Sequence, residues 1–114
     1  MAVISFSRQP EHIWCVAGWA FRQVLEDVKA HTQDPELRER LDAASETKYL
    51  LVEHLTPESA HQTTEAIREV VQGILSGEVR SSIFDQPDTP QEVLDQYQEG
   101  LSMLLKAIPE RVSK

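Results

Sequence analysis

Residues 56–77 read TPESAHQTTEAIREVVQGILSG and form the most complete helix signal in the chain. Thr56 offers a capping oxygen, Pro57 stands where a missing N–H does no harm, and Glu58 opposes the positive end of the helix dipole. The glycine that closes the stretch is a natural left-handed terminator. These signals together predict a helix over 57–76.

The same start signal recurs at three other places, where proline is followed by an acid or an amide. They are Gln9-Pro10-Glu11, Asp34-Pro35-Glu36 and Thr89-Pro90-Gln91-Glu92. In the last of them Thr89 and Glu92 also match a capping box, and Pro109 stops the helix that follows. The pattern therefore predicts three further helices, over roughly 10–31, 35–55 and 90–108.

Each predicted helix has one apolar face when its residues are placed at 100° per position. In the last helix this face carries Val93, Leu94, Tyr97, Leu101, Leu104, Leu105 and Ile108. Short connections between helices favour antiparallel neighbours. The sequence therefore predicts an all-α fold: a single domain over 1–114 that is an antiparallel four-helix bundle with a short N-terminal arm. We expect a dry apolar core that needs no cofactor to fold.

Composition narrows the class of protein. The chain has 114 residues, of which 11 are basic and 19 acidic, with a formal net charge of -8 and 40% apolar residues. The longest apolar run has about half the length of a membrane helix, and the amino terminus does not read as a secretory signal. The acidic balance argues against direct binding to nucleic acid or to a membrane, since both need basic patches. With a single cysteine as well, we expect a soluble, cytoplasmic protein.

The excess negative charge lies outside the first 33 residues, whose charges sum to zero. On the second predicted helix, an aromatic and an aliphatic residue are interleaved with acids. This predicted contact surface consists of Asp42, Glu46, Tyr49, Leu50 and Glu53. A patch of one sign with an embedded aromatic suits a basic protein partner, because it steers the encounter and supplies an anchor. The alternative is a solvated face that only keeps the protein dispersed.

Trp19 breaks the pattern of the first predicted helix, because it lies on the side away from the apolar stripe. One explanation is that the N-terminal arm, or the loop around Ile83 and Phe84, covers it. The other is that Trp19 anchors a partner or a second copy of the chain, since tryptophan is enriched among residues that dominate binding energy. Trp19 is therefore a candidate partner-binding residue.

Lys48 is the second irregular position, because it projects onto the inward side of the predicted helix 35–55. Burying an unpaired ammonium is costly, so the side chain must reach the surface, pair with a carboxylate or border a cleft. A catalytic lysine would need a second polar group aimed at the same pocket, and the sequence does not indicate one.

Candidate reactive groups are few. Glu58 and His61 have the Glu-x-x-His spacing of di-iron bundles, but such a site needs a second pair of this kind and two further Glu residues. Asp27 and His31 are spaced as a surface i,i+4 pair, which could hold zinc only weakly. Cys15 lies within a predicted helix, without the positive helix terminus that lowers the pKa of a thiol. We therefore expect no metal site, no cofactor and no enzymatic activity.

Three hypotheses for the function follow. The leading one is a small acidic protein-binding protein that masks a basic partner, such as a stoichiometric inhibitor, an immunity protein or an antitoxin. One alternative is a homo-oligomeric adaptor or scaffold, for example a homodimer, that uses the Trp19 face. The other is a metal-binding or ligand-binding helical bundle.

Overall fold

The computed structural model describes residues 1–109 and shows an α+β fold, so the prediction of an all-α four-helix bundle is wrong. The strands are β1 (Ala2–Ser5), β2 (Ile13–Val16) and β3 (Tyr49–Leu51). The α-helices are α1 (Gly18–Ala30), α2 (Pro35–Thr47), α3 (Pro57–Ser76) and α4 (Gln91–Ala107). Short 3-10 helices cover Pro10–His12 (η1), Val52–His54 (η2) and Ser82–Asp85 (η3).

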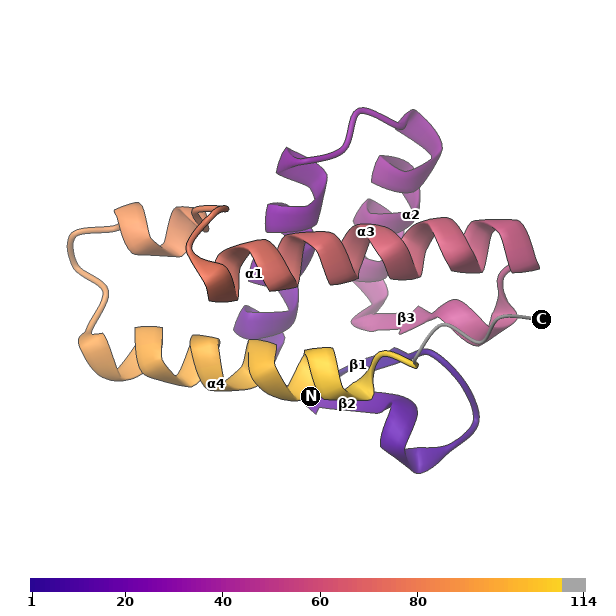
Figure 1. The fold of residues 1–114 in the computed structure, drawn as a ribbon, viewed down its shortest axis with the longest axis horizontal. Coiled ribbons are helices and arrows are strands. Elements are labelled where there is room, and N and C mark those ends of the chain that lie inside the picture. The colour runs from indigo at the N-terminus through magenta and orange to yellow at the C-terminus, as the bar shows by residue number, and fades with distance from the viewer. Residues whose placement is uncertain (110–114) are drawn as a thin grey trace.

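The α-helices form two pairs that cross each other steeply (Figure 1). α1 and α2 make one antiparallel hairpin, and α3 and α4 lie side by side as the second pair. The sheet lies next to the C-terminal part of α4, and its strand order is β2-β1-β3. β1 is therefore the central strand, antiparallel to β2 and parallel to β3.

The first predicted helix, over 10–31, is an α-helix only in its second half. η1 is a single turn, and β2 follows it, with Trp14 opposite Ile4 in the ladder with β1. The Trp14 indole Nε1–H donates to the main-chain oxygen of Gly100 in α4, at 3.0 Å. Side chains along β2 therefore alternate between solvent and core, with Ile13 exposed and Trp14 buried. The predicted N-terminal arm is β1 itself, which supplies the hydrogen-bonding partner that makes this segment a strand.

The second predicted helix, over 35–55, ends at Thr47. Lys48 follows in the left-handed conformation, with φ 66°, and its N–H donates to the oxygen of Ala44 at 2.7 Å. The Lys48 oxygen accepts from the N–H of Val3 at 3.0 Å, where the parallel pairing of β3 with β1 begins. Lys48 is therefore an exposed residue that ends a helix, and it does not project inward from one.

α3 has the predicted bounds, and α4 lies within the range predicted for it. The Thr56 hydroxyl accepts from a first-turn N–H at 3.2 Å, and Gly77 takes a left-handed φ of 87°. The capping box at Thr89 does not form. Pro90 occupies the N-cap position of α4, and the Thr89 hydroxyl bonds back into the preceding loop.

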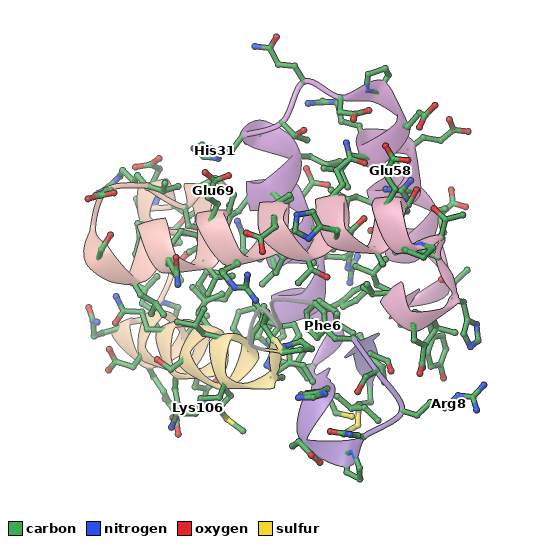
Figure 2. The ribbon with its side chains drawn as sticks, turned by 45° about the vertical axis from the view of Figure 1, so that its right-hand side comes forward. Phe6, Arg8, His31, Glu58, Glu69 and Lys106 are labelled. Carbon is green, nitrogen blue, oxygen red and sulfur yellow. The ribbon has the colours of Figure 1, made fainter. Side chains whose placement is uncertain are left out.

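An apolar core joins both helix pairs to the inner face of the sheet. Its largest fully buried side chains include Tyr97, Phe21, Ile4, Leu25, Leu37, Leu41, Ile67, Leu101 and Leu104. Phe6, directly after β1, turns inward beneath α3, whereas Arg8 projects away from the molecule (Figure 2). None of the helices described within residues 1–109 is long and apolar enough to cross a membrane.

Alanine substitution at Gly73 tests how closely the chain after α3 packs back against this helix. Gly100 of α4 is the control, because it has more space around it. A Cβ on Gly73 would lie 2.4 Å from Cγ2 of Val79, whereas a Cβ on Gly100 would lie no closer than 3.8 Å to Trp14. We expect Gly73→Ala to lower the free energy of unfolding by about 1–3 kcal/mol through overpacking. Gly100→Ala should raise it by about 0.5–1 kcal/mol, because alanine favours helix over glycine. Urea denaturation measures both values, and a stabilising Gly73→Ala would contradict the packing of Val79.

Asp34, the N-cap of α2, predicts a pH-dependent contribution to stability. Its carboxylate accepts hydrogen bonds from Gln62 of α3 and from N–H groups of the first turn, and these bonds, Gln62 first, hold the pKa of Asp34 below its ordinary 3.8. A depressed folded pKa adds stability above the unfolded pKa, and that stability is lost as the pH falls through the folded pKa. Asp34→Asn should therefore be less stable than wild type at about pH 6, and the difference should shrink progressively as the pH falls below the ordinary pKa of 3.8. Urea midpoints measured against pH decide this, and a difference that persists in acid would exclude the ionised cap as its cause.

Candidate functional site

Trp19, in the first turn of α1, keeps 39% of its surface exposed. One side of the indole packs against the ring of Tyr97 in α4, with ring centroids 6.2 Å apart and ring planes tilted by 42°. Ile83 of η3 lines a hollow together with Trp19. Trp19 is thus partly covered by the rest of the chain, and the remainder of its ring is open to solvent.

Two hollows meet at Trp19, which forms the ridge between them. The larger, of about 600 Å³, lies between α1 and the loop before α4, and its lining includes Trp19, Gln23, Ile83, Pro87, Asp88 and Val93. The smaller, of about 280 Å³, lies between the start of α1 and the middle of α4, and its lining includes Val16, Trp19, Ala20, Glu99, Gly100 and Met103. Together they offer two adjacent places for side chains of a bound molecule.

Both hollows combine apolar surface with a negative charge. Asp88 contributes to the larger and Glu99 to the smaller, and among residues 1–109 no lysine or arginine lines either one. Met103 is 58% exposed, and its flexible thioether adds adaptable apolar surface near Trp19. Such a surface fits a partner segment that has apolar anchors flanked by positive charges.

A buried polar cluster fixes the loop that forms one wall of the larger hollow. Asp27 of α1 is 3% exposed, and its Oδ2 accepts hydrogen bonds from the hydroxyls of Ser81, at 2.7 Å, and Tyr97, at 2.6 Å. Its Oδ1 accepts from the Gln23 amide at 3.0 Å, and the same amide donates to Ser82 at 2.9 Å. The Asp27 carboxylate therefore ties α1, the loop around η3 and α4 together next to Trp19.

Burial keeps the Tyr97 phenol in its donor form. Desolvation is the main cause that raises the pKa of Tyr97 far above its ordinary value of 10.0, and the neighbouring Asp27 raises it further. The phenol therefore stays protonated at neutral pH and donates to the carboxylate. Because Ser81 and Tyr97 are closed off from solvent, we assign this cluster a structural role.

The sequence interpretation missed this cluster, and the prediction of a dry apolar interior is wrong. The spacing of Asp27 and His31 predicts a surface pair, but Nδ1 of His31 lies 2.9 Å from the main-chain oxygen of Asp27 instead. A carbonyl oxygen only accepts, so Nδ1 carries the proton. The signal for burial is that Asp27 lies between Val24 and Val28 along the inward side of α1.

The residues of the predicted acidic contact surface belong to three different elements, α2, β3 and η2. Asp42 forms an ion pair with Lys29 of α1, and its hydrogen bond is the first cause that raises the pKa of Lys29 above 10.5. Leu50 is buried, 3% exposed, and faces inward from β3. These two residues therefore contribute to the fold, one by bridging α1 to α2 and the other by filling the core.

The other three residues of the predicted surface, Glu53, Glu46 and Tyr49, also lie in different elements. Glu53 turns toward β1, where its Oε1 accepts from the Ser5 hydroxyl at 2.8 Å, and its Oε2 is closed off from solvent with no hydrogen-bond partner among residues 1–109. Glu46 and Tyr49 are exposed, but Tyr49 belongs to β3 and Glu46 to α2. Because the helix ends before Tyr49, the five residues do not line one helix face as predicted.

A third hollow, of about 560 Å³, lies between the end of α1 and α3. His31 and Glu69 stand together at its edge (Figure 2). In the part of the chain that the structure describes, no three His, Cys, Asp or Glu side chains are placed to hold a metal ion. This hollow therefore offers no described ligand set for a metal.

Comparisons with known proteins add no assignment. The chain matches no family model, no curated protein and no solved structure. Its function therefore has to be argued from the Trp19 site itself.

The bond between Tyr97 and Asp27 can be tested with a matched pair of tyrosines. We expect Tyr97→Phe to lower the free energy of unfolding by about 1.5–3 kcal/mol, because it removes a buried donor to a carboxylate. Tyr49→Phe removes the hydroxyl of a ring that is 55% exposed and should leave stability within about 0.5 kcal/mol of wild type. Urea denaturation compares the two, and equal effects would exclude a stabilising role for the cluster.

Proposed function

We propose that this chain is a small acidic protein-binding protein that masks a basic partner, in the manner of a stoichiometric inhibitor, an immunity protein or an antitoxin. The observation that carries the proposal is a half-exposed Trp19 between two hollows, neither of which is lined by a basic residue in the part of the chain that the structure describes. Tryptophan beside pockets is typical of the few residues that dominate binding energy. The proposed contact surface is thus the Trp19 face, in place of the second predicted helix.

Charge supports a basic partner. The chain carries a formal net charge of -8, and acids border both hollows. A field of one sign speeds the encounter with an oppositely charged protein, and the apolar ridge holds the complex once it has formed. Two copies meeting through this face would instead bring Asp88 and Glu99 toward the same acids of the other copy. The Trp19 face is therefore better suited to a different, basic protein than to a homo-oligomer.

Binding rather than catalysis is the function that the side chains support. The Asp27 cluster is sealed beneath the surface, where it positions the loop beside Trp19. Cys15, the single cysteine of the chain, is exposed, and an exposed free thiol persists best in a reducing compartment. We therefore place this activity in the cytoplasm.

Selection from a random peptide display library tests the proposal without knowledge of the natural partner. We expect the enriched peptides to combine an aromatic or aliphatic anchor with lysine or arginine. Their affinity should fall at least tenfold in Trp19→Ala, since truncating such an anchor costs about 2 kcal/mol or more. It should also fall as salt rises, because screening weakens the attraction to Asp88 and Glu99. Titration calorimetry at two ionic strengths gives both values.

Leu75→Ala is the control, because Leu75 is 37% exposed on α3 and lines neither hollow. This variant should bind the selected peptides as wild type does. Thermal denaturation of Trp19→Ala shows whether its fold is retained, and Met103→Glu offers a second substitution in the same site at a residue that is 58% exposed. Enriched peptides without basic residues would refute the proposal. So would peptides that bind Trp19→Ala and Met103→Glu as tightly as they bind wild type.

A further inference from the structure

The strand register sorts the sheet residues into two faces of unlike character. Ile4 pairs with Trp14 on one side and with Leu50 on the other, and all three are buried against the helices. The opposite face is the outer face, and its register positions are Val3, Ser5, Ile13, Cys15, Tyr49 and Leu51. None of these six positions carries a charged residue, and five of them are apolar.

The outer face departs from the usual pattern of a sheet that is packed on one side only. Such sheets place polar residues outward, so that one face is wetted. Here Tyr49 is 55%, Ile13 37% and Leu51 36% exposed, and Cys15 is also exposed. Ser5 is the polar exception, and its hydroxyl is already engaged with Glu53. Apolar side chains gathered in this way are characteristic of a contact surface.

The free edge of β3 is a poorer candidate for that contact. Since Val3 bonds to Lys48, the main-chain groups of Tyr49 point away from β1. The Thr47 hydroxyl occupies both of them: it accepts from the Tyr49 N–H at 3.3 Å and donates to the Tyr49 oxygen at 3.2 Å. Because β3 has only three residues and the outward main-chain groups of Tyr49 are already hydrogen-bonded, its edge is poorly suited to pair with another strand. The face of the sheet, rather than the edge of β3, is the proposed contact surface.

The charge distribution favours a second copy of this chain as the molecule that binds the outer face. Each copy of the chain carries a formal charge of -8, whereas β1, β2 and β3 contain no charged residue. Two copies therefore repel each other least where these uncharged strands meet. An apolar patch is also complementary to itself, as a two-fold interface requires. A basic partner would gain no attraction from these six positions and is better served at the Trp19 face.

We propose that the outer face of the sheet binds a second copy of this chain, forming a homodimer with the two sheets face to face. Ser5 is only 3% exposed, so five side chains present the surface, and they cover less than the ~800 Å² per partner of a standard interface. The dimer is therefore weak: it forms near ~1 mM and dissociates near ~10 µM. None of the six positions lines a hollow beside Trp19, so a dimer retains two Trp19 sites.

The dimer and the Trp19 site should respond to salt in opposite directions. Salt screens the repulsion between two copies of charge -8, so self-association should tighten as ionic strength rises. Binding of a basic peptide to Trp19 should weaken under the same conditions. Sedimentation equilibrium in low and high salt measures the first response. Self-association that weakens with salt would overturn the proposed interface.

Two substitutions separate the surfaces. Tyr49→Glu places like charges in the interface and should abolish the dimer, while leaving affinity for the selected basic peptides unchanged. Met103→Glu should leave the dimer intact. Both residues are more than half exposed, so the fold should tolerate either change, and circular dichroism checks this. A chain that stays monomeric at ~1 mM in high salt overturns the proposal, as does a dimer lost in Met103→Glu but kept in Tyr49→Glu. A chain that stays monomeric leaves the Trp19 proposal untouched, whereas a dimer lost only in Met103→Glu would place self-association at the Trp19 face. Failure of peptide binding at Trp19 appears only in the peptide measurements.

Cys15 reports on the same interface in the unmodified protein. It is exposed in the single chain and lies on the outer face, opposite Val3 in the register. Alkylation of its thiol by iodoacetamide should slow as wild-type concentration rises through the dimerisation range, and should stay constant in Tyr49→Glu. A rate independent of concentration in a wild-type sample that sedimentation shows to be dimeric would place the contact elsewhere.

Discussion

β1 is hydrogen-bonded on both sides, and the rest of the fold depends on this pairing. Its antiparallel partner is residues 13–16 and its parallel partner is residues 49–51. Both partners come from segments with apolar residues that also suit a helix. Pairing with β1 shortens α1 at its start and α2 at its end, so the two form a compact hairpin that crosses α3 and α4. It also decides that Leu50 faces inward and Tyr49 outward.

The Asp27 carboxylate plays the corresponding role for the candidate site. A buried carboxylate is costly unless donors surround it, and here they come from Gln23 of α1, from Ser81 before η3 and from Tyr97 of α4. Removing the loop would leave the carboxylate with fewer donors. The cluster therefore holds the loop around η3 in one position. In that position the loop forms a wall of the hollow beside Trp19.

Charge divides the surface of the molecule into regions with different uses. Acids border the hollows at Trp19, whereas the outer-face positions of the sheet are uncharged. Some of the remaining acidic side chains serve the fold, since Asp42 bridges α2 to α1 and Asp34 caps α2 while accepting from α3. The net charge of -8 thus describes the protein as a whole, but only the local distribution of acids distinguishes the two proposed contact surfaces.

The sequence by itself determined what depends on neighbours within a few residues. The bounds of α3 follow from Thr56, Pro57 and Gly77, and the position of α4 from its proline and its apolar stripe. Trp19 is conspicuous in the sequence because it lies on the side of its predicted helix away from the apolar stripe that faces the core. Only the tertiary structure decided the strands and the buried cluster, because their partners are distant: Ser5 meets Glu53 48 residues away, and Asp27 meets Tyr97 70 residues away. Hydrogen bonds across such separations form only when the whole chain packs, and no local pattern encodes them.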